Sequence, residues 1–221
     1  MKIGLFGGTF NPIHLGHIGA ALEVKKVFAL EKIYLIPSAL PPHKEPRGVS
    51  DARDRMEMAR LAVLNHPDFC VSDVELNRSG PSYTIDTVRH FKSILPDDAD
   101  LHFILGLDAF LEIDTWKSYR DLFQLISFIV MTRPDRAYRD TAKMRQALAA
   151  FIESRMSVGY RFSLTESCYV HNEKQPVYMI DVPPADISST MIRKHVSEGR
   201  SVRAMVPESV ADFITNRGLY L

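Results

Sequence analysis

The first seventeen residues, Met1 to His17, constrain this chain more than any other stretch. Lys2 to Phe6 is a short apolar run that ends at Gly7-Gly8, which is typical of a buried strand followed by a turn that approaches another group closely. After the loop from Thr9 to Ile13, the segment from Leu15 to Leu30 has the pattern of an amphipathic helix. The start of a helix favours anions, because its first N–H groups have no partner within the helix and the helix dipole has its positive end there. We therefore predict a phosphate site where the strand, the turn and the helix meet.

Two histidines stand at the entrance of this predicted helix. His14 and His17 are one helical turn apart, so both rings can face a single group. An imidazole in this position can donate a hydrogen bond to a phosphoryl oxygen or carry a positive charge. The simpler alternative is a surface turn whose histidines only cap the helix, but a cap needs one polar side chain and this stretch supplies several.

Composition and charge exclude several classes of protein. At 221 residues, we expect a single domain over 1–221, with a helical C-terminal subregion over about 185–221. The formal net charge is zero without a long basic block, which disfavours a nucleic-acid or anionic-membrane binder. Cys70 and Cys168 have no CxxC spacing, and no apolar run approaches the length of a membrane span. We expect a cytoplasmic protein with reduced thiols.

Strands and helices alternate along the rest of the chain. We predict strands at 32–37, 69–76, 101–105, 126–132 and 177–182, and helices at about 51–65, 84–95, 141–156, 188–198 and 207–217. The stretch 38–47 reads as an exposed loop, and 157–175 has no clean period. This alternation predicts an α/β fold of the Rossmann-like, doubly wound kind, with a mainly parallel sheet, helices on both faces and a small C-terminal helical segment.

The predicted topology brings several candidate groups to one edge of the sheet. Gly7-Gly8, Ser38, Gly106 to Asp108, and Arg133 all follow predicted strands directly. Ligands of such sheets lie beyond the carboxyl ends of the strands, so these groups would share one rim.

The stretch from Gly7 to His17, GGTFNPIHLGH, resembles the GTFDPxHxGH signature of the nucleotidyltransferase superfamily, which cradles the triphosphate of a nucleotide. Asn11 stands where this superfamily usually has Asp. An amide keeps the turn-forming hydrogen bond of that position but not its charge.

Four further strings resemble the bacterial nicotinate-mononucleotide adenylyltransferases: Pro41-Pro42-His43-Lys44, Gly80 to Thr84, Asp114 to Lys117 around the only tryptophan, and Ile187 to Arg193. The resemblance implies transfer of the adenylyl group of ATP to nicotinate mononucleotide. The products would be deamido-NAD and pyrophosphate, in NAD biosynthesis.

The resemblance also implies a role for each matching residue. The catalytic residues would be His14, His17 and Arg193, with the histidines stabilising charge on the α-phosphoryl group. ATP would be bound by Gly7, Gly8, Thr9, Phe10, Gly106, Asp108, Ser189 and Arg193. The mononucleotide would be bound by Lys44, Ser82, Tyr83, Thr84, Trp116 and Lys117. Lys44 would bind a phosphate, Thr84 would offer its backbone N–H to the nicotinate carboxylate, and Trp116 would stack on the pyridine ring.

The implied chemistry needs no activated side-chain nucleophile. The 5′-phosphate of the mononucleotide is already an anion at neutral pH and can attack the α-phosphorus of ATP in line, without a covalent enzyme intermediate. Mg²⁺ is the expected cofactor. Because Mg²⁺ binds mainly through substrate phosphates and water, we expect no dedicated metal site built from side chains.

Each of these residues also has a simpler explanation. Lys44 fits a solvated loop lysine, Trp116 a core residue, Asp108 a helix cap, and Arg193 an exposed salt-bridge partner. Ser188-Ser189-Thr190 fits a helix cap, which is compatible with phosphate binding.

Two other functions fit the same residues. One is an adenylyltransferase that prefers nicotinamide mononucleotide or phosphopantetheine, and the other is a module that senses ATP without chemistry. The sequence is compatible with a monomer or a homo-oligomer.

Overall fold

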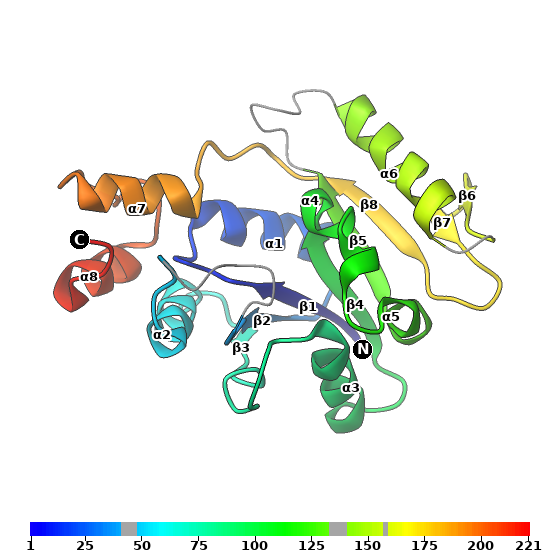
Figure 1. The fold of residues 1–221 in the computed structure, drawn as a ribbon, viewed down its shortest axis with the longest axis horizontal. Helices are drawn as coiled ribbons and strands as arrows, with labels where there is room; N and C mark the ends of the chain where they lie inside the picture. Colours follow the sequence, from blue (N-terminus) through cyan, green and yellow to red (C-terminus); the bar gives the residue numbers. More distant parts are fainter. Residues whose placement is uncertain (41–47, 133–140, 157–158) are drawn as a thin grey trace.

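The computed structural model describes residues 1–40, 48–132, 141–156 and 159–221, and within these ranges eight strands form one sheet (Figure 1). The strand order is β3-β2-β1-β4-β5-β8-β7-β6. All neighbours from β3 to β8 pair in parallel, whereas β7 pairs antiparallel with both β8 and β6. The strands are β1 (Lys2–Gly8), β2 (Lys32–Pro37), β3 (Phe69–Val71), β4 (Asp100–Gly106), β5 (Ser127–Thr132), β6 (Arg161–Ser163), β7 (Cys168–Val170) and β8 (Val177–Asp181).

Helices cover both faces of this sheet. They are α1 (Leu15–Phe28), α2 (Ala52–Ala62), α3 (Thr84–Ile94), α4 (Leu107–Phe110), the 3₁₀ turn η1 (Ile113–Thr115), α5 (Tyr119–Leu125), α6 (Thr141–Arg155), α7 (Ser189–Ser197) and α8 (Glu208–Arg217). One core contains Val24 of α1, Met58 of α2 and Val210 of α8, and the other contains Val88 of α3 and Leu148 of α6. The predicted Rossmann-like, mainly parallel fold with small C-terminal helices is confirmed.

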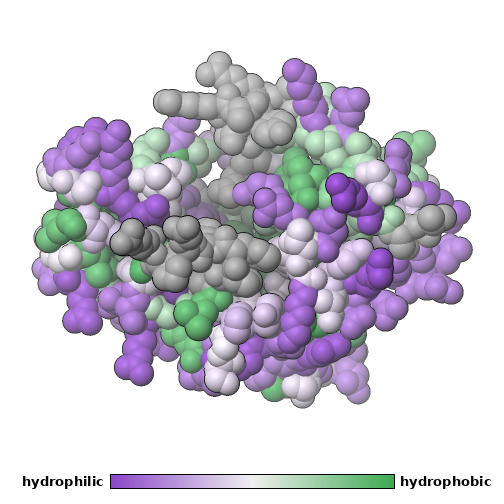
Figure 2. All heavy atoms as spheres, viewed as in Figure 1, coloured by the Kyte–Doolittle hydropathy of each residue, from purple (hydrophilic) through white to green (hydrophobic). Residues whose placement is uncertain are grey.

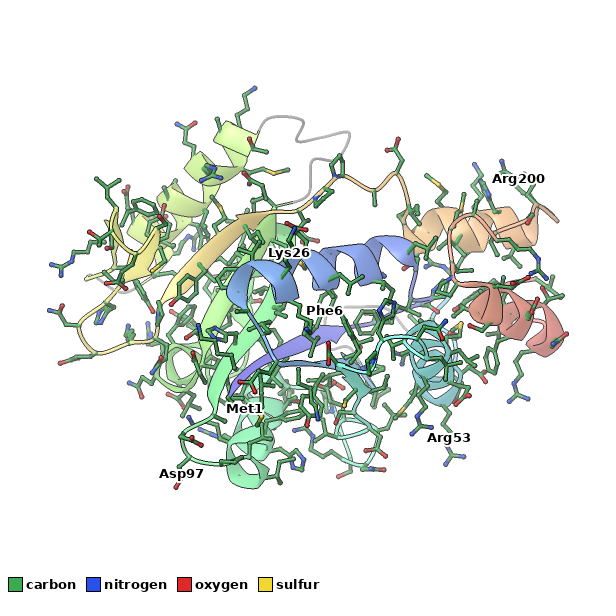
Figure 3. All side chains as sticks on the ribbon, turned by 180° about the vertical axis from the view of Figure 1, so that it is seen from behind. Met1, Phe6, Lys26, Arg53, Asp97 and Arg200 are labelled. Atoms are coloured by element: carbon green, nitrogen blue, oxygen red, sulfur yellow. The ribbon has the colours of Figure 1, made fainter. Side chains whose placement is uncertain are left out.

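Strand β1 lies in the middle of the sheet and alternates between the two cores. Ile3 and Leu5 belong to the core under α3 and α6, whereas Phe6 belongs to the core under α1 (Figure 3). Side chains of successive strand residues point to opposite faces, so a strand buried on both sides is apolar throughout. The carboxyl end of β1 is flanked by β2 and β4, with Gly8 opposite Pro37. The loop Thr9 to Ile13 of the signature sequence, called the signature loop below, therefore starts at the centre of the rim.

The C-terminal helices α7 and α8 lie at one end of the molecule, and α6 with the β6–β7 hairpin lies at the other (Figure 1). Helix α8 packs against α2, where the Ser209 hydroxyl donates to the Leu61 carbonyl oxygen at 3.2 Å and Arg217 pairs with Asp54 at 3.1 Å. On the face shown in Figure 2, apolar residues form small patches separated by polar ones. No described helix has the length and apolar character needed to cross a bilayer.

Several element boundaries differ from the sequence prediction. Strand β3 ends at Val71 instead of residue 76, because the Ser72 hydroxyl accepts from the Val74 N–H at 3.3 Å and turns the chain away from the ladder. Helix α2 ends at Ala62 rather than Asn65, because the N–H of the C-cap residue Val63 donates to the Arg60 carbonyl oxygen, three residues back, at 3.2 Å.

Two groups of short elements were not predicted. Residues 157–175, where the sequence shows no clean period, contain the hairpin of β6 and β7, and residues 107–125 contain α4, η1 and α5. Three-residue strands and four-residue helices are too short for a hydrophobic period to develop.

Candidate active site

The loop between β1 and α1 leaves no room for a side chain at Gly8. A Cβ atom there would lie 2.8 Å from Cζ of Phe10. Phe10 has a φ of 48°, in the left-handed region, and its ring is buried. This conformation turns the Phe10 ring into the core, so Phe10 can offer only its backbone to a ligand. The same ring meets the His17 ring edge-on, at 5.2 Å between centroids.

The structure brings the two predicted histidines together at the start of α1. Their ring centroids are 3.7 Å apart, with planes inclined at 31°. The His14 N–H donates to Nδ1 of His17 at 3.3 Å, so the hydrogen of a neutral His17 ring is on Nε2. His14 is the N-cap of α1 and is only 2 % exposed. Gly16 leaves space for the His14 ring, because a Cβ there would lie 3.1 Å from Nδ1 of His14 and 3.1 Å from Cβ of Ala185.

Side chains of helix α7 bind the backbone of the signature loop at Asn11 and Pro12. The Ser189 hydroxyl donates to the Pro12 carbonyl oxygen at 2.9 Å, and Nη1 of Arg193 donates to the Asn11 carbonyl oxygen at 2.8 Å. The Ser188 side chain accepts from the Met191 N–H at 3.1 Å, so Ser188 is the N-cap of α7. Ser189 and Arg193, both predicted to reach phosphate, thus lie at the signature loop and bind its backbone.

Asn11 uses both ends of its amide and is 6 % exposed. Its Nδ2 donates to the Gly48 carbonyl oxygen at 2.7 Å, while its Oδ1 accepts from the Ser50 N–H at 3.1 Å and from the Tyr220 hydroxyl at 2.9 Å. Burial raises the pKa of Tyr220 to about 12, so this phenol is a neutral donor at neutral pH. An ionised aspartate could accept these bonds, but it could not donate to Gly48.

Arg55 of α2 is a residue of the rim that the sequence analysis did not identify. Its side chain is 1 % exposed, and its donors bind three backbone carbonyl oxygens: Nε to Ser50 at 3.0 Å, Nη1 to Thr9 at 2.8 Å and Nη2 to Ala39 at 3.2 Å. The signal for it was its spacing, four residues before Ala59, on the buried side of an amphipathic helix. A charged arginine side chain on the buried side of a helix needs hydrogen-bond acceptors in the interior, because an unpaired buried charge is costly.

The electrostatic environment of Arg55 is set by burial. Burial lowers its pKa from the ordinary value, and the attraction of the negative charges on Asp51 and Glu75 opposes that shift. The guanidinium stays charged, since arginine does not lose its proton in proteins. A permanent positive charge therefore lies directly behind Thr9 of the signature loop.

The described residues that were predicted to bind the mononucleotide gather around the start of α3. Thr84 is the first residue of this helix and Tyr83 is its N-cap, without a side-chain cap hydrogen bond. The Lys117 ammonium lies 4.5 Å from the centre of the Tyr83 ring and 3.1 Å from Oδ2 of Asp86. Trp116 directly precedes Lys117, so the structure brings Trp116 and Thr84 to the same part of the rim.

Ser82 binds the loop that follows β2. Its hydroxyl oxygen accepts from the N–H groups of Ala39 at 2.9 Å and Leu40 at 3.2 Å, and its own N–H donates to the Leu40 carbonyl oxygen at 3.0 Å. The predicted mononucleotide ligand Ser82 is therefore engaged in fixing a neighbouring backbone segment.

The signature loop and the part of the rim around Trp116 meet over β1 and β4. A Cβ at Gly7 would lie 3.2 Å from the Phe103 ring, and that ring meets the half-buried Trp116 ring edge-on, at 6.2 Å between centroids. Gly106 is the N-cap of α4, and Asp108 is exposed in the first turn of α4, beyond the carboxyl end of β4. Gly106, rather than Asp108, thus caps this helix.

Some predicted groups lie outside the described residues: Lys44, with the rest of Pro41-Pro42-His43-Lys44, and Arg133. Among the described residues, no three His, Cys, Asp or Glu side chains are arranged to hold a metal ion.

Comparison with known proteins finds relatives over the whole chain. The sequence model of the cytidylyltransferase-like family matches residues 5–195. A probable nicotinate-nucleotide adenylyltransferase of Desulfatibacillum aliphaticivorans is 43 % identical, covering 100 % of both chains. One from Geobacter metallireducens is 40 % identical, covering 100 % of this chain and 98 % of the relative.

Solved structures share the fold. The Plasmodium falciparum nicotinic acid mononucleotide adenylyltransferase complexed with NaAD superposes with a TM-score of 0.71 at 17 % identity, covering 99 % of this chain and 97 % of the other.

Proposed function

Because this chain belongs to the cytidylyltransferase-like family, and within it to the nicotinate-nucleotide adenylyltransferases, we propose that it transfers the adenylyl group of ATP to nicotinate mononucleotide. The products are deamido-NAD and pyrophosphate. The observation that carries this proposal is the pair of imidazole rings 3.7 Å apart at the start of α1, next to a glycine turn at the carboxyl end of the central strand. Two such rings can serve one polyphosphate.

The proposed reaction is a direct in-line substitution. An oxygen of the mononucleotide 5′-phosphate forms a bond to the α-phosphorus of ATP, and the bond from that phosphorus to the bridging oxygen breaks. The bridging oxygen keeps the electron pair and leaves with pyrophosphate, so no side chain has to form a covalent bond. His14 and His17 stabilise the negative charge that develops on the α-phosphoryl group.

The backbone of the loop Gly8-Thr9-Phe10 contributes to the same phosphate site. Arg193 and Ser189 bind the carbonyl oxygens of Asn11 and Pro12, which keeps the outer part of this loop in place. Gly106 and Asp108 contact the adenosine, with the exposed Asp108 carboxylate accepting from a ribose hydroxyl.

The acid group of the acceptor is recognised at the start of α3. Thr84 offers its backbone N–H to the nicotinate carboxylate, and the positive end of the helix favours this anion. Trp116 stacks on the pyridine ring. Lys117 and Tyr83 complete this side of the site, and the Lys117 charge is shared with Asp86. Lys44 supplies a further phosphate contact.

We propose Mg²⁺ as the cofactor, held mainly through the substrate phosphates and water. The donor set of the phosphate loop fits this arrangement, because it consists of imidazoles and backbone N–H groups rather than the oxygen ligands that Mg²⁺ prefers. When bound, Mg²⁺ would neutralise negative charge on the leaving pyrophosphate.

The test is to measure dinucleotide and pyrophosphate formation from ATP and four acceptors: nicotinate mononucleotide, nicotinamide mononucleotide, phosphopantetheine and none. We expect the highest kcat/KM with nicotinate mononucleotide, because a carboxylate suits backbone N–H donors whereas a carboxamide also needs an acceptor. Faster turnover of another acceptor would overturn the assigned substrate. ATP binding without pyrophosphate release from any acceptor would identify an ATP sensor instead.

A further inference from the structure

We propose that Arg55 is a positioning residue that sets the phosphate loop and the mononucleotide side of the rim in a fixed relation to each other. The inference rests on the proposed adenylyl transfer and adds to it a residue that touches neither substrate. Arg55 is fully buried, and its planar fork binds carbonyl oxygens of three separate segments: Thr9 after β1, Ala39 after β2 and Ser50 before α2. No other contact described above ties all three segments together.

The phosphate loop around Thr9 is held by contacts from two sides. Thr9 stands between Gly8, which has no room for a side chain, and Phe10, whose backbone is in the left-handed region. Such a loop needs outside contacts to keep one conformation. Nη1 of Arg55 supplies one from the inner side, at 2.8 Å from the Thr9 carbonyl oxygen. Arg193 supplies another on the outer side, at Asn11.

Arg55 is also connected to the mononucleotide side of the rim, through Ala39. Ala39 is bound at both ends of its backbone: its carbonyl oxygen accepts from Nη2 of Arg55 at 3.2 Å, and its N–H donates to the Ser82 hydroxyl at 2.9 Å. Ser82 is two residues before Thr84, the first residue of α3. A continuous chain of hydrogen bonds thus runs from Thr9 through Arg55, Ala39 and Ser82 to the start of α3.

The geometry of these three hydrogen bonds requires an arginine. The three carbonyl oxygens are served by three different nitrogens, and a planar guanidinium offers donors in these fixed directions. A lysine keeps the charge, but its donors diverge from one nitrogen and cannot reach three such oxygens together. Within the described chain, no carboxylate forms an ion pair with Arg55, so its role there is to bind backbone.

In-line transfer between two bound phosphates depends strongly on their relative placement, and an error of about 1 Å can reduce the rate by about a hundredfold. Arg55→Lys is therefore expected to lower kcat/KM by at least about tenfold and to weaken ATP binding by at least about threefold. The control is Val63→Ala, which opens a cavity at the other end of α2, far from the rim. We expect Val63→Ala to keep kcat/KM within about twofold of the wild type, measured at a temperature where both variants are folded.

A second variant tests the chain of hydrogen bonds should Arg55→Lys fail to fold. Ser82→Ala removes the acceptor for the Ala39 and Leu40 N–H groups. If the two sides are connected through Ala39 and Arg55, ATP binding measured by calorimetry without any mononucleotide weakens by about threefold or more. A Ser82 that only contacts the mononucleotide would leave ATP affinity unchanged.

The proposal is overturned if Arg55→Lys loses no more activity and ATP affinity than Val63→Ala, or if Ser82→Ala binds ATP as tightly as the wild type. These outcomes are distinct from a failure of the proposed function. Wild-type protein that forms no deamido-NAD would refute the adenylyl transfer, whereas the ATP affinities of the variants would still test the role of Arg55.

Discussion

Two neighbours orient the His17 ring: the His14 N–H donates to its Nδ1, and the Phe10 ring meets it edge-on. We predict that His17→Ala lowers kcat by at least about a hundredfold, as expected for the loss of a donor that stabilises transition-state charge. Steady-state kinetics with nicotinate mononucleotide measures this effect, and circular dichroism checks that the variant keeps its fold. Turnover near the wild-type level would remove His17 from the catalytic residues.

Trp116 is half-buried, with one edge in the core against Phe103. We predict that Trp116→Ala weakens mononucleotide binding by about 1–3 kcal/mol, the range of stacking between bases and aromatic side chains. The KM for the mononucleotide reports this effect, and Phe162→Ala is the control, because Phe162 is an exposed aromatic residue on β6. An unchanged KM would show that Trp116 is only a core residue.

Asn11 binds through both its carbonyl and its amino group, so restoring the aspartate that is usual in the superfamily should be unfavourable in this chain. A carboxylate oxygen would face the Gly48 carbonyl oxygen at the present 2.7 Å. We predict that Asn11→Asp lowers the free energy of unfolding by about 1–3 kcal/mol at neutral pH, the cost of an unsatisfied buried polar group. Urea unfolding measures it, with the exposed Asn65→Asp as control. Equal or higher stability of Asn11→Asp would contradict the described network.

Some residues of the candidate site could be identified from the sequence and others could not. His14 and His17 could be identified from one motif, and Ser189 and Arg193 from a second, because the spacing within each short stretch is itself informative. The roles of Arg55 and of the partners of Asn11 could not be identified, since the groups involved come from segments far apart in the sequence: the loop after β1, the connection between β2 and α2, and the C-terminus. The roles of the motif residues stay predictions.

Among the secondary-structure elements, those with a long hydrophobic period were predictable. Strands β1, β2 and β5 and helices α1, α3 and α6 begin and end within about two residues of their predicted bounds. The β6–β7 hairpin was missed because its strands have three residues each, and β3 was overextended because its last residues alternate like a strand while Ser72 forms a turn.

Helix α7 carries the outer contacts to the signature loop, and Ser188 caps it. We predict that Ser188→Ala lowers the free energy of unfolding by about 1 kcal/mol, the usual effect of losing an N-cap. Urea unfolding measures the loss. Ser197→Ala at the other end of the same helix is the control, and a similar effect in both variants would argue against a specific cap.

For the whole molecule, the alternation of strands and helices was enough to predict the parallel sheet, while the placement of the site at the carboxyl edge stays a prediction. The two antiparallel strands beyond β8 extend that sheet, but they lie at the end opposite α7 and α8 and do not alter the order of the central strands (Figure 1). One domain over the whole chain and a location in the cytoplasm stay predictions.

The most direct measurement is a crystal structure with deamido-NAD bound. The account predicts that the phosphates of the dinucleotide contact the His14 and His17 rings and that the pyridine ring stacks on Trp116, with its carboxylate at the Thr84 N–H. A dinucleotide whose phosphates lie away from both imidazoles, or that binds at the opposite edge of the sheet, would contradict it.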